Sequence, residues 1–143
     1  MGTAVTKKNI PLHVVFVEAW VRNDNKYLLA KRSSKDDQMA GKWAVPGGKV
    51  DMELENNIIE NSLKREVMEE VGVKVSNPRF FASRSFIRSS GHHVVALSFL
   101  LDYKSGDAKP LEGQDEIRWV TMEEMKVLLD EHWNDVLSSL AKK

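Results

Sequence analysis

Three glutamates are the residues of this sequence whose types and spacing could do chemistry. Glu66, Glu69 and Glu70 lie in a stretch with the pattern of a helix. At about 100° per residue, their carboxylates fall within an arc of roughly 100°, with like charges as neighbours in the C-terminal half, where the macrodipole disfavours anions. This is a poor arrangement for stability. It suits a hard divalent cation, because Mg²⁺, Mn²⁺ and Ca²⁺ take carboxylate ligands; the alternative is a solvated acidic helix face.

The helix that would carry these glutamates has local start and stop signals. Asn57 can cap its N-terminus, with Glu60 three residues later in a box-like arrangement. Gly72 stands where a left-handed C-terminal cap is expected. One apolar stripe repeats every four residues and predicts a buried face, made of Ile59, Leu63, Val67 and Val71.

The context of the glutamates favours a site over a solvated face. Pro46-Gly47-Gly48 precedes the helix with backbone that can approach a ligand closely, and Arg65 comes directly before the first glutamate. Residues 65–73, REVMEEVGV, resemble the second half of the Nudix box, which reads Arg-Glu-apolar-any-Glu-Glu-any-Gly-apolar. Gly48 is similar to the glycine that opens the box. The resemblance implies the Nudix fold, metal binding by the three glutamates, and a catalytic role for them and for Arg65.

The first half of the box departs from the family pattern. The family has five residues between the opening glycine and a glutamate, and then seven before the arginine. Here the seventh position back leads to Asn57, and eight residues separate it from Gly48, which indicates a three-residue insertion. In the family the missing glutamate mainly braces the arginine, so Glu53 and Glu55 are the candidates to brace Arg65.

Further matches extend the resemblance to the MutT-like branch of the family. They lie at residues 30–32, 39–43, 46–49 and 112–114. The resemblance implies that the Gly47 carbonyl and Glu112 join the glutamates in binding metal, with Asp115 and Glu116 as alternatives to Glu112.

The same resemblance implies three substrate-binding residues. Arg32 would contact a phosphate or the base, Lys49 a phosphate, and Asn134 the purine, since an asparagine side chain offers a donor and an acceptor together. The alternatives are a solvated arginine at the end of a strand and an exposed asparagine on a helix. The tryptophans at 43, 119 and 133 are expected in the core, although one could cover a base.

Composition bounds the class of protein. With 143 residues, 42% hydrophobic and 29% charged, we expect one domain over 1–143, with 1–10 as a loosely ordered lead-in; the resemblance implies that it is a Nudix domain. The 21 basic and 21 acidic residues argue against a nucleic-acid partner bound by a basic surface. The absence of cysteine fits a reducing, cytoplasmic location, and no apolar run is long enough to predict a membrane span. Monomer and homodimer both remain open.

The remaining elements predict an α+β fold, layered α/β/α, with a mixed sheet packed between helices. After Thr121 a second helix is expected to run toward the C-terminus, with a capping box completed by Glu124 and a core face of Met122, Met125, Leu128 and Leu129. Residues 76–78, SNP, should break the chain. Strands are expected at 12–21, 27–31, 43–45, 79–88, 93–103 and 117–120.

Together these features predict a Mg²⁺- or Mn²⁺-dependent hydrolase of a nucleoside diphosphate linked to another group. The MutT-like matches favour a nucleoside triphosphate, including an oxidised or damaged one, cleaved to monophosphate and pyrophosphate. ADP-ribose, another nucleotide sugar or a dinucleotide is the alternative substrate. A non-catalytic Nudix domain that senses a nucleotide is the alternative from another class.

Overall fold

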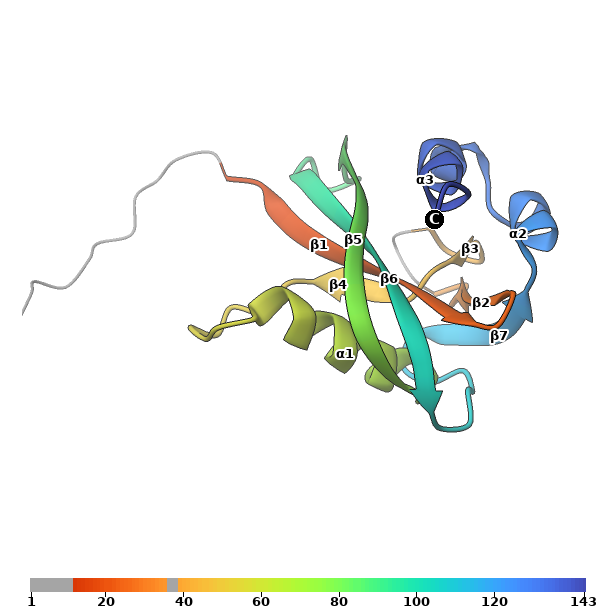
Figure 1. Ribbon diagram of the computed structural model, residues 1–143. Coiled ribbons are helices and arrows are strands. Elements are labelled where there is room, and N and C mark those ends of the chain that lie inside the picture. The colour runs from red at the N-terminus through yellow and green to blue at the C-terminus, as the bar shows by residue number, and fades with distance from the viewer. Residues whose placement is uncertain (1–11, 36–38) are drawn as a thin grey trace, which may run out of the picture.

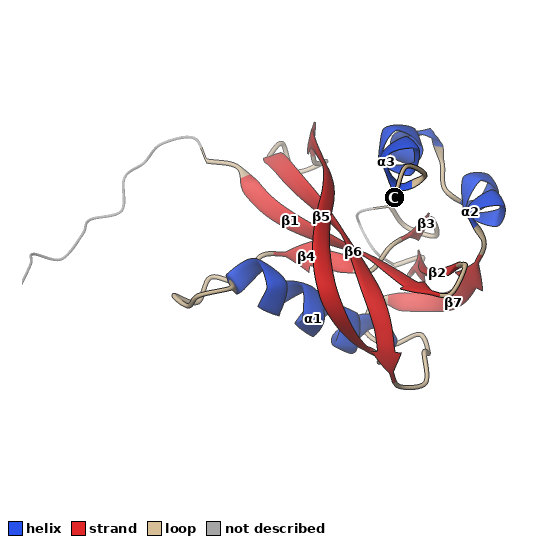
Figure 2. Ribbon diagram, viewed as in Figure 1, coloured by secondary structure: helices blue, strands red, loops and turns tan. Residues whose placement is uncertain are grey.

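The central strand β1 (Val14–Asn23) pairs parallel with β6 and antiparallel with β2 and β4. Seven strands form one mixed sheet in the order β3-β2-β1-β6-β5, with β4 added on β1 and β7 on β2. The computed structural model describes residues 12–35 and 39–143 (Figures 1 and 2). The expected lead-in at 1–10 therefore lies outside the described residues. The other elements are β2 (Lys26–Arg32), β3 (Trp43–Ala44), β4 (Gly47–Lys49), α1 (Ile58–Val71), β5 (Lys74–Ile87), β6 (His93–Ser105), β7 (Gln114–Val120), α2 (Met122–Leu128), a 3₁₀ turn (Glu131–Trp133) and α3 (Asn134–Leu140).

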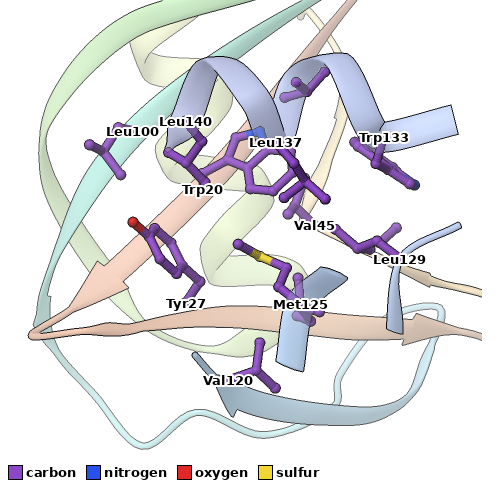
Figure 3. Packing of buried hydrophobic residues seen from close by; sticks show 13 residues of the cluster. Trp20, Tyr27, Val45, Leu100, Val120, Met125, Leu129, Trp133, Leu137 and Leu140 are labelled. Atoms are coloured by element: carbon purple, nitrogen blue, oxygen red, sulfur yellow. The ribbon is translucent and has the colours of Figure 1, made fainter. Parts of the chain in front are cut away.

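Alternation along β1 divides the core into two layers, because successive strand residues point to opposite faces of a sheet. Val17, Ala19 and Val21 pack with the buried stripe of α1. Trp20 points to the other face and packs with residues of α2, the 3₁₀ turn and α3, including Met125 (Figure 3). Figure 1 shows α1 on one side of the sheet and α2 and α3 on the other. This confirms the predicted mixed sheet between helices.

Several local predictions are confirmed. The stripe on α1 is buried at Leu63, Val67 and Val71, and Ile59 packs against the same cluster. Gly72 adopts a left-handed conformation, and its N–H donates to the carbonyls of Val67 and Met68. Among the described residues, no helix is both long and apolar enough to cross a membrane.

Three predictions about the elements are wrong. Asn57 is left-handed and makes no side-chain cap, so the predicted capping box of α1 is absent. The segment 76–78 does not end an element: β5 passes through it, with Asn77 at a positive φ and an irregular register there. The predicted second helix is divided, because Leu129 and Asp130 are extended and the Asp130 side chain caps a new 3₁₀ turn before α3.

The capping box of α2 is present and gives a test of local stability. The Thr121 side chain accepts from the Glu124 N–H (3.3 Å), and Glu124 accepts from the Thr121 N–H (3.0 Å). Thr121→Ala should lower the free energy of unfolding by about 1 kcal/mol, because one N–H of the first turn loses its acceptor. Urea denaturation measures the change. Thr121→Ser keeps the hydroxyl and serves as the control; an equal loss in both variants would contradict this explanation.

Candidate active site

The site forms where helix α1 approaches strand β4. The Gly47 N–H donates to Glu70 Oε2 at 3.3 Å. A side chain on Gly48 would place its Cβ 2.6 Å from Glu66 Oε1, and one on Gly47 would place its Cβ 2.3 Å from the Val17 carbonyl oxygen. Gly47 therefore needs glycine for space, and a side chain at Gly48 would displace the Glu66 carboxylate. The glycine pair thus brings the backbone of β4 against two of the predicted metal ligands.

Glu70 is the buried carboxylate of the site, at 6% exposure. Its Oε1 accepts from Gln114 Nε2 at 2.9 Å and lies 4.0 Å from Arg32 Nη1. Burial, and then the hydrogen bond and charge of Glu66, raise the pKa of Glu70 to about 9. A buried carboxyl group beside a second carboxyl group favours its protonated form, and a bound cation would remove the need for that proton.

Arg65 orients the other carboxylates. Its Nη1 donates to Glu69 at 2.9 Å and its Nη2 to Glu66 Oε1 at 3.0 Å. Nε donates to Asp51 Oδ2 at 2.9 Å, and Nη2 also contacts Asp51 Oδ1. These partners, with Asp51 first, raise the pKa of the guanidinium above its ordinary value, so it stays charged. One arginine thus fixes two glutamates of α1 relative to the end of β4.

Asp51, not Glu53 or Glu55, braces Arg65, and the prediction from the family spacing is wrong at this point. Asp51 lies three residues after Gly48, and its N–H donates to the buried Ser62 Oγ at 3.0 Å. The extra residues follow it, in a loop where Met52 and Leu54 are exposed. The sequence signal was an acidic residue two positions after the end of β4, a position that the family spacing does not include.

The turn that carries Glu112 is attached to the end of α1. The Leu111 N–H donates to the Glu70 carbonyl at 2.9 Å, and Gln114 Nε2 contacts both the Glu112 carbonyl and the Glu70 side chain. Glu112 itself is exposed. Of its alternatives, Asp115 accepts from the Ser34 N–H, and Glu116 pairs with Arg118.

The donors at this site are carboxylate and carbonyl oxygens, a set that fits Mg²⁺ or Mn²⁺. Within residues 12–35 and 39–143, no three His, Cys, Asp or Glu side chains are already gathered closely enough to hold an ion. The contact between Glu66 and Glu70 supports the fit, because like charges stay adjacent at a site that a cation can neutralise. The backbone of Gly47, the proposed carbonyl ligand, contacts Glu70, and the adjacent Gly48 lies against Glu66.

A cavity of about 280 Å³ opens beside the glycine pair. Arg32 and Lys49 line it, as the resemblance predicts for substrate contacts. Asn134 is exposed at the start of α3 and does not belong to the lining, whereas its neighbour Trp133 does. Trp133 is also a core residue, at 2% exposure, and the tryptophans at 43 and 119 pack against the core, as predicted.

The cavity also contains an ion pair that the sequence analysis missed. Glu18 on β1 and Arg84 on β5 line the wall and join through Arg84 Nη2 and Glu18 Oε2 at 2.5 Å. The available signal was a glutamate within the apolar run of β1, since buried carboxylates are rare unless paired. The partner is 66 residues away and has no local signal.

Comparison with known proteins agrees with this geometry. The NUDIX domain family model matches residues 12–141. The chain belongs to the Nudix family. A MutT protein from Methanosarcina mazei Go1 has a similar crystal structure, with a TM-score of 0.79 at 27% identity over 95% of this chain and 97% of that one. The Nudix fold and the MutT-like character are thus confirmed.

Two curated relatives differ in what their names say they act on. The NAD-capped RNA hydrolase NudC of Vibrio atlanticus is 33% identical over 118 residues, which is 82% of this chain but only 36% of that protein. The ADP-ribose pyrophosphatase of Methanocaldococcus jannaschii is 31% identical over 88% of this chain and 73% of its own. Both names describe hydrolases of nucleotide derivatives, with different substrates.

The buried Glu70 carboxyl predicts a pH dependence of the metal-free protein. Its pKa is raised in the folded state, so the folded protein binds more protons than the unfolded chain between about pH 4.5 and 9. The free energy of unfolding should therefore fall as pH rises through this window. Urea denaturation in EDTA at several pH values measures the slope. In Glu70→Gln the contribution should disappear, and an unchanged slope would contradict the assignment.

Asp51 gives a second prediction. Asp51→Asn should reduce hydrolysis by roughly 10- to 100-fold, the range for partners that orient catalytic ligands, because Arg65 would lose its charged brace. Steady-state kinetics with Mg²⁺ measure the effect. Glu53→Gln, in the neighbouring loop, should retain the wild-type rate. A large loss of rate in Glu53→Gln and none in Asp51→Asn would instead support Glu53 as the residue that braces Arg65.

Proposed function

We propose that this protein is a Mg²⁺- or Mn²⁺-dependent pyrophosphohydrolase that cleaves a nucleoside triphosphate to monophosphate and pyrophosphate. The observation that carries the proposal is the contact of Glu66 and Glu70 with the Gly47-Gly48 backbone, directly beside a cavity lined by Arg32 and Lys49. The acidic side chains proposed to bind metal and the basic side chains proposed to bind phosphate thus lie close to the same short strand, β4. The MutT-like matches of the sequence at residues 30–32, 39–43, 46–49 and 112–114 support the choice of a triphosphate.

Each residue has a role in this proposal. Glu66, Glu69, Glu70, the Gly47 carbonyl and Glu112 would hold the metal, and when bound it would supply charge neutralisation for the phosphate oxygens and a lower pKa for the attacking water. Glu66 positions the attacking water and accepts its proton, while Arg65 keeps Glu66 and Glu69 in place through charge-assisted hydrogen bonds. Attack on phosphorus breaks one phosphoanhydride bond, and pyrophosphate leaves. Arg32 and Lys49, which line the cavity, bind phosphate groups, whereas Asn134 lies outside the lining and is given no base contact in this proposal.

ADP-ribose is the second candidate substrate, because the relative from Methanocaldococcus jannaschii matches over most of both chains. The test is hydrolysis with Mg²⁺ across ordinary and oxidised nucleoside triphosphates, ADP-ribose and diadenosine polyphosphates, with products identified. Pyrophosphate from a triphosphate supports the proposal, and AMP from ADP-ribose replaces it with the second candidate. Tight binding without turnover of any substrate would favour a nucleotide-sensing domain.

Glu69 gives the sharpest variant of this test. Glu69→Gln should lower turnover by more than about 100-fold, because a metal ligand is lost while the amide remains nearly the same size. This loss should exceed that of Asp51→Asn, which changes only a residue that positions the ligands. The melting temperature should stay close to that of the wild type, since Glu69 is exposed. Glu60→Gln, in the first turn of the same helix, is the control. Full activity of Glu69→Gln would refute the metal assignment.

A further inference from the structure

A buried carboxylate on β1 begins a second polar assembly in the cavity wall. Glu18 is 6% exposed and points to the face of the sheet covered by α3, since it alternates with the residues that pack on α1. A buried carboxylate requires hydrogen bonds and a counter-charge. Glu18 has both: Oε1 accepts from Ser98 Oγ at 2.8 Å and from Arg84 Nε at 3.4 Å, and Oε2 accepts from Arg84 Nη2 at 2.5 Å.

Hydrogen bonds to core residues hold the Glu18 carboxylate in place. Ser98 Oγ accepts from Trp20 Nε1 at 3.1 Å while it donates to Glu18. Trp20 is fully buried and meets Trp133 edge to face, with ring centroids 5.6 Å apart (Figure 3). Hydrogen bonds therefore run from the core through Ser98 and Glu18 to Arg84, and they hold the guanidinium in one orientation.

Arg84 presents a preorganised donor to the cavity. Its guanidinium carbon lies 4.3 Å from the centroid of the Trp133 ring and 4.9 Å from that of Phe86. Nε and Nη2 face Glu18, so Nη1 is the nitrogen of this group that makes no hydrogen bond within the part of the chain that the structure describes. The side chain is 22% exposed and lines the cavity with both rings.

We propose that Arg84 is a specificity-determining residue that donates from Nη1 to an exocyclic oxygen of the nucleotide base. The cavity then prefers bases with an oxo group, such as 6-oxopurines and 4-oxopyrimidines, over their amino counterparts. Arginine has donors and no acceptor, so an exocyclic amino group would set donor against donor. The inference rests on the proposed function in one respect, which is that the cavity binds a nucleotide.

Charge assigns Arg84 to the base rather than to a phosphate. Its positive charge is already balanced by Glu18 at contact distance, which makes it a weak anion site. Arg32 Nη1 lies 4.0 Å from Glu70, and Lys49 directly follows Gly48, which lies against Glu66, so these two cations stand beside the carboxylates where we place the phosphate chain. Glu18 also pairs with Gly47 across β1 and β4, so the partner of Arg84 lies on the strand next to the one that carries the glycine pair.

Two matched substrate pairs test the proposal. ITP and ATP differ at position 6 of the purine, and UTP and CTP at position 4 of the pyrimidine. The wild type should favour the oxo member of each pair by about tenfold in kcat/KM, chiefly through KM, within the range that one good base contact gives. Arg84→Gln should bring both ratios close to one. Equal use of both members by the wild type, or an unchanged ratio in Arg84→Gln, would overturn the proposal.

Arg79→Gln is the matched control. Arg79 lies on the same strand and pairs with Asp102 on β6 at 3.0 Å, but it does not line the cavity, so both substrate ratios should stay at the wild-type value. Ser98→Ala tests the positioning by the core. It should reduce the oxo preference, because it releases Glu18 without removing a substrate contact. A preference unchanged in Ser98→Ala and lost in Arg79→Gln would also overturn the proposal.

Binding without turnover separates this proposal from the proposed function. The affinities for IMP and AMP are measured in EDTA by isothermal titration calorimetry, for the wild type and for Arg84→Gln. Tighter binding of IMP that depends on Arg84, in a protein that hydrolyses none of the triphosphates, would uphold the base contact and refute the hydrolase. Hydrolysis of ITP and ATP at equal rates, with equal binding of IMP and AMP, would uphold the hydrolase and refute the base contact.

Discussion

The close approach of α1 to β4 is the constraint on which the site depends. Space for a side chain is missing at Gly47 and at Gly48, because a carbonyl of β1 fills one position and the Glu66 carboxylate the other. Because the two glycines carry no side chains, α1 packs its buried stripe onto the sheet and also brings Glu66 and Glu70 into contact with the backbone of β4. The fold and the acidic site therefore share one contact, and a larger residue there would disturb both.

Acidic side chains at such short range need compensation, and the structure supplies it in two ways. Arg65 binds Asp51, Glu66 and Glu69 together and remains charged. Glu70, which is buried out of reach of that guanidinium, has its pKa raised instead. A bound metal would replace the second mechanism and leave the first in place. The acidic face of α1 thus needs positive charge, and Arg65 supplies only part of it.

The sequence predicted the parts of this arrangement that depend on neighbouring residues. The buried stripe of α1, the left-handed Gly72 and the capping box at Thr121 follow from spacings of three or four residues, and all three are present. Asp51 and Arg84 were missed for a different reason. Asp51 reaches Arg65 across an irregular loop, and Arg84 meets Glu18 on a strand far away in the chain, so no local period marks either pair.

The hydrogen bond from Asp51 to Ser62 has a consequence for how the chain can vary. It ties the end of the glycine strand directly to α1, so the residues between them, including the exposed Met52 and Leu54, form a closed loop outside the site. For a flexible loop, doubling the length costs only about 0.6 kcal/mol in closure entropy. Added length at this point therefore costs little stability. An insertion that breaks the spacing of a family motif can leave its geometry intact when a fixed contact bridges the insertion.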